Sequence, residues 1–183
     1  FLKNCYLARD TLRNQAIELR DELEFNSMAA VNKSEATKQF IFLHPGSGYL
    51  KEAKALYERQ VYEESTEFRN AASYLSFLRN NPDNKMVNQA YEKLFSIYRE
   101  NKDVNGLALF VSEFPNAPQN IEAWKLLFSL TVKTYSYAEL KRFLDRFPKF
   151  PLKNTILKEL ELNKLVLYPY GKGDLVGDIS DTG

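Results

Sequence analysis

The sequence contains only one cysteine and one histidine among its 183 residues. A single cysteine excludes an internal disulfide, and this pair cannot supply the four nitrogen or sulfur ligands of a structural zinc site. Long apolar stretches are also absent, since no run approaches the roughly eighteen residues of a membrane span and the beginning, FLKNCYLARD, lacks the pattern of a signal peptide. We therefore expect no metal, no cofactor and no membrane insertion by this segment.

An excess of charge of either sign is missing as well. Lysine and arginine number 25 and aspartate and glutamate 24, and the two signs are interspersed along the chain. A surface that binds nucleic acid or anionic lipid needs a basic stripe, so neither is expected as a partner. What the chain does have is a 44% share of hydrophobic residues, enough to bury one core.

Four segments of the chain share one pattern, an apolar cluster that ends in a proline: KQFIFLHP, LSFLRNNP, ALFVSEFP and KRFLDRFP. Their prolines, Pro45, Pro82, Pro115 and Pro148, are separated by 37, 33 and 33 residues. Mostly apolar residues recur eight, five and four positions before each proline, and a small-then-large pair recurs eight and twelve positions after it. Such spacings place side chains on one helical face, and proline cannot continue a helix. Each unit is therefore predicted to be a helix, a short turn and a second helix.

This register resembles the tetratricopeptide repeat, a helical hairpin of nearly this length with large apolar residues on its first helix and a small-then-large pair on its second. The resemblance covers residues 34–163. Two features depart from the family pattern, because the proline lies between the helices of a unit and the usual glycine of the first helix is replaced by Ile41, Leu78, Val111 and Leu144.

A two-helix unit cannot bury its apolar face alone, so such units stack. The resemblance therefore implies an all-α fold, a right-handed α-α solenoid of helical hairpins, over residues 1–167. The expected units are at about 34–64, 68–101, 104–134 and 137–165. A further helix at about 3–25 is expected to be a cap or the second helix of another unit.

Residues 168–183 change character, because glycines become frequent and helical spacing stops. We expect a short non-helical tail, either a linker or the start of a β-rich module. The passage ending in GKGDLVGDISDTG is similar to the junction that precedes WG-repeat β-modules in certain Gram-negative envelope proteins, although Val176-Gly177-Asp178 lacks the usual aromatic residue. That resemblance implies a periplasmic or outer-membrane-associated parent protein. A cytoplasmic setting, and a removed signal peptide or lipid anchor, stay open.

The glycine-rich turn in FLHPGSGYLKEA follows the only histidine and raises the question of a phosphate site with a catalytic base. The repeat explains the turn as a bend, because GSG occupies the position of DNK, NAP and KFP in the other units. A phosphate loop also needs a following Lys-Ser or Lys-Thr pair. His44 is interpreted as a helix-end residue near free carbonyls. The sequence identifies no nucleophile that it could activate and no acidic residue that could orient its ring.

Other candidate groups have plain structural interpretations. Cys5 is expected to be a packing residue, and the adjacent carboxylates Asp21-Glu22 and Glu63-Glu64 are expected on solvated helix faces. The sequence therefore predicts no catalytic residue, and the chain is not expected to be an enzyme.

The favoured hypothesis is a noncatalytic scaffold whose concave surface, made mainly by first helices, binds a protein or peptide. Offsets of ten, seven and three residues before each proline identify positions expected to line it: Lys38, Phe42, Arg79, Ser112, Lys141 and Asp145. One alternative is a structural spacer between flanking domains, with a polar groove and no affinity. Another is an enzyme with a cryptic site, which requires polar residues with shifted pKa values clustered in a pocket.

Overall fold

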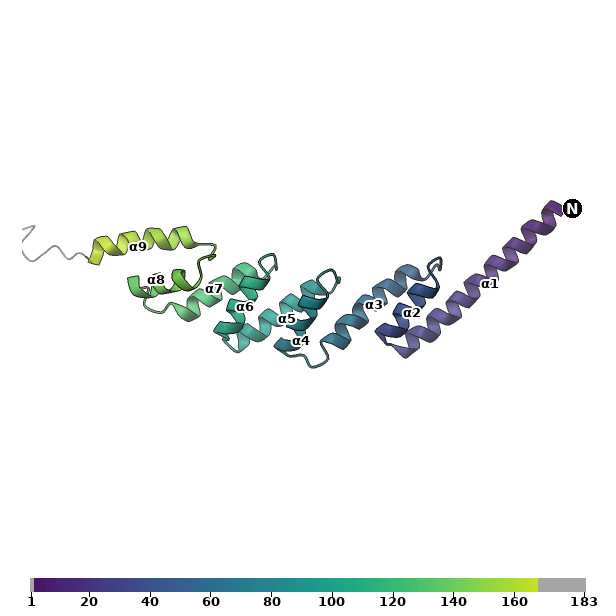
Figure 1. Ribbon diagram of the computed structural model, residues 1–183, viewed down its shortest axis with the longest axis horizontal. Helices are drawn as coiled ribbons and strands as arrows, with labels where there is room; N and C mark the ends of the chain where they lie inside the picture. The colour runs from purple at the N-terminus through teal and green to yellow at the C-terminus, as the bar shows by residue number, and fades with distance from the viewer. Residues whose placement is uncertain (1, 168–183) are drawn as a thin grey trace, which may run out of the picture. The chain divides into compact units, whose positions relative to one another are not determined.

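The computed structural model describes residues 2–167, with side chains at 9–158 and 160–162, and every regular element in that range is an α-helix (Figure 1). The all-α prediction is confirmed for these residues. The side chain of Cys5 and the tail 168–183 lie outside the described part, so their predictions are untested. The helices are α1 (Leu2–Val31), α2 (Ser34–Leu43), α3 (Leu50–Ser65), α4 (Ala71–Asn80), α5 (Val87–Glu100), α6 (Val104–Glu113), α7 (Asn120–Thr131), α8 (Tyr137–Arg146) and α9 (Lys153–Leu167).

The chain divides into two compact units, residues 1–94 and 95–183, with the boundary inside α5. In the first unit, α1 packs against α2, α2 against α3 and α3 against α4. In the second unit, α6 packs against α7 and α8 against α9. Helix packing within each unit therefore joins neighbours in sequence, which is the contact pattern of helical repeats.

Four turns with the same backbone hydrogen bonds connect α2 to α3, α4 to α5, α6 to α7 and α8 to α9. They span residues 44–49, 81–86, 114–119 and 147–152. In each turn, the amide of the residue before the proline donates to the carbonyl of the phenylalanine five positions before the proline, at 2.8–3.0 Å. The second amide after the proline then donates to the carbonyl of the residue that precedes the proline, at 3.1–3.2 Å. The proline turns expected from the sequence are thus one structure used four times.

The predicted apolar stripes form the core. All of their residues are buried except Ile41 and Tyr57, which are half-buried. Before the prolines, the buried residues are Thr37, Tyr74, Leu107 and Leu140, then Phe40, Phe77, Phe110 and Phe143, then Leu78, Val111 and Leu144. After the prolines, they are Ala53, Ala90, Ala123 and Ile156, then Leu94, Leu127 and Leu160.

Each link from a second helix to the next first helix contains one non-glycine residue in the left-handed region. These residues are Asn32, Arg69, Lys102 and Tyr135, with φ of 47–54°. At the end of α5 the geometry is a Schellman motif, because the amide of Asp103 donates to the carbonyl of Tyr98 and the amide of Lys102 to that of Arg99. The left-handed position of this motif favours glycine, since any Cβ there is crowded.

Side chains from elsewhere in the fold also cap helices. The carboxylate of Glu64, at the end of α3, accepts hydrogen bonds from the amide of Ser34 at 2.9 Å and from its hydroxyl at 2.5 Å. These bonds lower the pKa of Glu64. The first turn of α2 is therefore stabilised by an anion supplied by the following helix. Glu64 is exposed, as expected of a residue on a solvated helix face, and it has the additional role of capping α2.

Replacing Lys102 by glycine is expected to raise the free energy of unfolding by about 0.5–1 kcal/mol, because glycine adopts the left-handed conformation without a Cβ penalty. The matched control is Lys93→Gly in the middle of α5, which should lower it by about 1 kcal/mol. Chemical denaturation measures both. Destabilisation by both variants would show that the conformation of Lys102 carries no strain.

Enlarging a small residue of the core should overpack it. Ala123 is fully buried in α7, so Ala123→Leu is expected to cost about 1–3 kcal/mol of stability. Ala138 lies exposed on α8, and Ala138→Leu serves as the control with little effect expected. Equal denaturation midpoints for the two variants would contradict the proposed register of the stripes.

Candidate functional site

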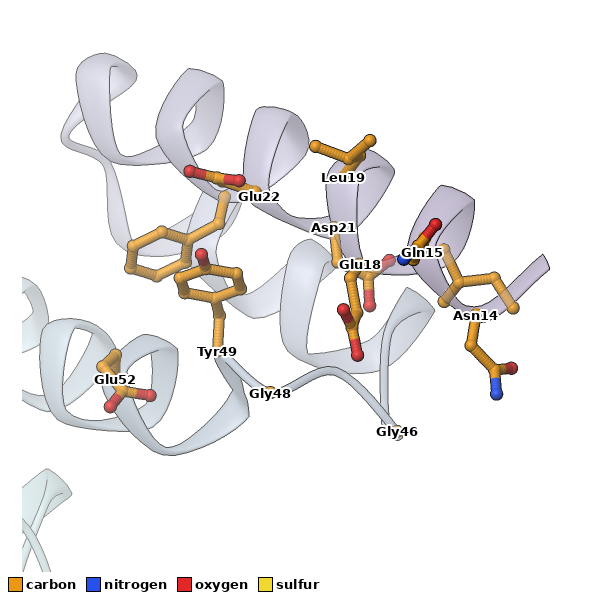
Figure 2. A pocket seen from close by; sticks show the side chains of 12 residues that line it. Asn14, Gln15, Glu18, Leu19, Asp21, Glu22, Gly46, Gly48, Tyr49 and Glu52 are labelled. Carbon is orange, nitrogen blue, oxygen red and sulfur yellow. The ribbon is translucent and has the colours of Figure 1, made fainter. Parts of the chain in front are cut away.

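A pocket of about 1010 Å³ in the first unit lies between α1 and the GSG turn (Figure 2). Glu18, Asp21 and Glu22 approach it from α1 and Glu52 from α3, and no basic side chain is among the described residues that line it. Beside them the ring of Tyr49 stacks on that of Phe25, with centroids 5.0 Å apart. We call this depression the acidic pocket. Its remaining lining residues are Asn14, Gln15, Ile17, Leu19, Gly46 and Gly48.

His44 lies beside the acidic pocket and is held by two carboxylates from α1. Its Nδ1 is 3.1 Å from Oδ1 of Asp21, and its Nε2 is 2.5 Å from Oε2 of Glu24. The imidazole also stacks on the ring of Phe40, with centroids 4.8 Å apart. Only 8% of its side chain is exposed. The histidine therefore joins the end of α2 to α1.

The geometry around His44 is structural. A carboxylate can only accept hydrogen bonds, so both ring nitrogens donate to Asp21 and Glu24 when the imidazole is protonated. Ser47 hydrogen-bonds the carboxylate of Asp21 instead of the imidazole. A nucleophile activated by histidine needs a ring nitrogen in hydrogen-bond reach, and here each nitrogen already faces a carboxylate.

Two expectations from the sequence are corrected here. His44 does end a helix, as its amide bond to Phe40 shows, but its side chain binds carboxylates instead of lying near free carbonyls. Asp21 is buried and not solvated, while its neighbour Glu22 is exposed. The acidic partners of His44 lie on α1, 20 and 23 residues earlier in the sequence, so no local pattern could reveal them.

The carboxylate of Asp21 is the centre of this cluster. Arg20 donates to it through Nη2 at 2.7 Å and through Nε at 3.1 Å. The hydrogen bonds from Arg20, followed by those of Ser47 and His44, hold the pKa of Asp21 below its ordinary value. Asp21 is therefore charged at neutral pH, and its contribution to stability is present above the ordinary carboxyl pKa.

A second pocket, of about 490 Å³, lies in the second unit among α7, α8 and α9. The ring of Phe128 lines it, stacked on Phe150 at 5.6 Å and edge-on to Tyr135 at 5.7 Å between centroids. At its rim, Tyr135 is 59% exposed and Leu152 is 51% exposed. We call this depression the aromatic pocket. Its other lining residues are Lys125, Ser129, Leu140, Thr155 and Ile156.

The six residues predicted to line a binding groove are all exposed. Three lie in the first unit, Lys38 and Phe42 on α2 and Arg79 on α4, and three in the second, Ser112 on α6 and Lys141 and Asp145 on α8. None of them lines the acidic or the aromatic pocket. Phe42 stands out, because 82% of this apolar side chain is exposed.

The aromatic pocket was missed by the sequence analysis. Tyr135 belongs to a link and Leu152 to a turn, so neither falls on a stripe of the repeat. The available signal was the pair of phenylalanines in the turn after α8, RFPKFP, which gives more aromatic residues than one stripe can hold.

Among the side chains that the structure describes, at residues 9–158 and 160–162, no cluster of three or more histidine, cysteine, aspartate or glutamate residues is placed to hold a metal ion. The same search range contains no helix with both the length and the apolar character needed to cross a bilayer. Comparison of the chain with family models, with curated proteins and with solved structures finds no match.

Replacing Asp21 by asparagine is expected to lower the free energy of unfolding by about 1–3 kcal/mol at pH 7, because His44 and Arg20 lose a charged acceptor. The loss should shrink as the pH falls through the depressed pKa of Asp21, where the wild-type carboxylate is protonated too. Urea denaturation at neutral and acid pH measures the difference. Glu22→Gln, one residue along the same helix, is the control. An equal loss of stability in both variants would show that the bonds of Asp21 to His44 and Arg20 do not stabilise the fold.

Proposed function

We propose that the chain is a noncatalytic scaffold for protein–protein interaction, built of tetratricopeptide-like helical hairpins that stack as a right-handed solenoid. Four hairpins with one shared turn geometry and one shared set of buried positions support this proposal. Helical hairpins of this kind bury their apolar stripes against neighbours and leave polar faces for binding. The wider setting that we propose is the bacterial envelope, on the strength of the resemblance to repeats that precede WG modules.

The observation that carries the proposed function is the aromatic pocket. Most of its lining residues are apolar or aromatic, and two of them, Tyr135 and Leu152, are exposed to solvent. A concave apolar surface with a few polar groups is the usual form of a site that receives an anchoring side chain. Lys125 stands at the edge and supplies the cation for an acidic neighbour of that anchor. The partner we propose is therefore a peptide segment with an aromatic or aliphatic anchor next to an acidic residue.

The exposed first-helix residues supply a second proposed contact surface. Phe42 is apolar and largely exposed, and Lys38 lies one turn before it on the same helix. An exposed aromatic residue on a rigid helix is a common anchor at protein interfaces. A structural spacer needs neither this side chain nor an apolar pocket, so both favour binding over spacing.

The experiment uses peptides selected from a random library against the wild-type chain and tests them on two aspartate variants. Leu152 precedes α9, where aspartate is a favourable N-cap, so Leu152→Asp adds a charge to the pocket rim without harming the fold. Ile121 is equally exposed in the first turn of α7 and lies outside the pocket, so Ile121→Asp is the matched control.

We expect the selected peptides to bind the wild type and Ile121→Asp with the same Kd, and to bind Leu152→Asp about tenfold or more weakly. Isothermal titration measures all three, and circular dichroism checks the fold. Equal binding to both variants would show that the peptides bind outside the aromatic pocket. A library that yields no binder would favour the spacer.

A further inference from the structure

The outer face of α1 is a helical surface without a partner among the described residues. Every side chain from Arg9 to Arg20 is exposed, although α1 is one continuous helix that projects past α2 (Figure 1). A helical stretch of about twelve residues is marginal in water unless one face is covered. We therefore expect another helix to cover the exposed part of α1.

An apolar stripe on this face has the spacing of a coiled coil. Leu12, Ala16, Leu19 and Leu23 follow one another at intervals of 4, 3 and 4 residues, which is the alternation of the a and d positions of a heptad. The three leucines are 66%, 60% and 70% exposed. Ala16 lies at the middle of the stripe, where a small side chain lets a second helix approach closely. We call this set the leucine stripe.

The leucine stripe points away from the body of the first unit. At about 100° per residue, its residues lie on the side of α1 opposite Asp21 and Met28, which are buried against the rest of the unit. Figure 2 shows Leu19 pointing away from the GSG turn while Glu18 points toward it. The stripe therefore faces mainly away from α2 and α3, although Leu19 also borders the acidic pocket.

The residues at the two edges of the stripe favour one direction for pairing with a second copy. One edge of the stripe carries Arg13 and Arg20, and the other carries Gln15 and Glu22. Two parallel copies of α1 place the basic edge of one against the other edge of its partner, whereas two antiparallel copies place the arginines of both chains together. Arg20 uses Nε and Nη2 on Asp21, and its five N–H donors leave capacity for Gln15 of a second copy.

We propose that the leucine stripe dimerises this chain by forming a parallel, two-stranded coiled coil with α1 of a second copy. The stripe is self-complementary in this direction, and the body of each chain lies on the outside of the pair. Because the seam spans only about two heptads, the dimer is expected to be weak and to dissociate on dilution. The proposal does not depend on the aromatic pocket or on the proposed function.

Sedimentation equilibrium of the whole chain tests the dimer. We expect dimer mass at about 200 μM, monomer at about 1 μM, and a dissociation constant raised at least tenfold by Leu19→Lys. Asn14→Lys adds the same charge on the opposite side of α1 and should behave as the wild type. A monomer at every concentration would overturn the proposal, and the expected partner of the stripe would then be a different protein. A dimer that tolerates Leu19→Lys would overturn it too, because another surface then holds the copies together.

Disulfide trapping tests the direction of the helices. In a Cys5→Ser background, Leu12→Cys should oxidise to a crosslinked dimer, since residue 12 faces its own copy in a parallel pair. Asn14→Cys is the control and should remain uncrosslinked. In an antiparallel pair residue 12 faces Leu23, so a dimer that fails to crosslink through Leu12→Cys would overturn the parallel arrangement.

Discussion

The stop that a proline imposes on each first helix is the constraint on which this fold depends. Proline lacks the amide that the next helical turn requires, so the chain must reverse, and the carbonyl of the phenylalanine five positions earlier accepts the last helical bond. Because the reversal has the same hydrogen bonds each time, residues at fixed offsets from the proline occupy equivalent places. In this way one repeated turn positions the phenylalanines, leucines and alanines of the core.

The repeat explains why the sequence predicts the helices and the core so well and the polar contacts so poorly. Stripes and proline turns depend on spacing within one hairpin, which a single sequence displays. The bond between His44 and Asp21 and the bonds between Ser34 and Glu64 join different helices, and no periodic signal marks them. Gly106 is a similar case, because only the structure shows that a Cβ there would clash with the buried ring of Tyr98.

Two buried polar residues of the first unit, Thr37 and Gln60, connect helices across the core. Thr37 occupies a position that is apolar in the other units, and its hydroxyl donates to Gln60 at 2.5 Å. Gln60 in turn donates to Asn32, the left-handed residue of the first link. Both Thr37 and Gln60 are almost fully buried, so this satisfied network costs little and fixes the approach of α2 to α3.

Link length separates residues that fold the chain from residues that are available for binding. The short links 32–33 and 101–103 contain little beyond the residues that end and begin helices. The longer links 66–70 and 132–136 have room for additional residues, and each exposes an aromatic side chain, Phe68 at 78% and Tyr135 at 59%. The ring of Tyr135 packs against the fold only through its edge-on contact with Phe128, and a loop held by rigid helices presents such an exposed ring at a fixed place. The binding that we propose therefore uses a longer link and the residues beside it, which is where the aromatic pocket lies.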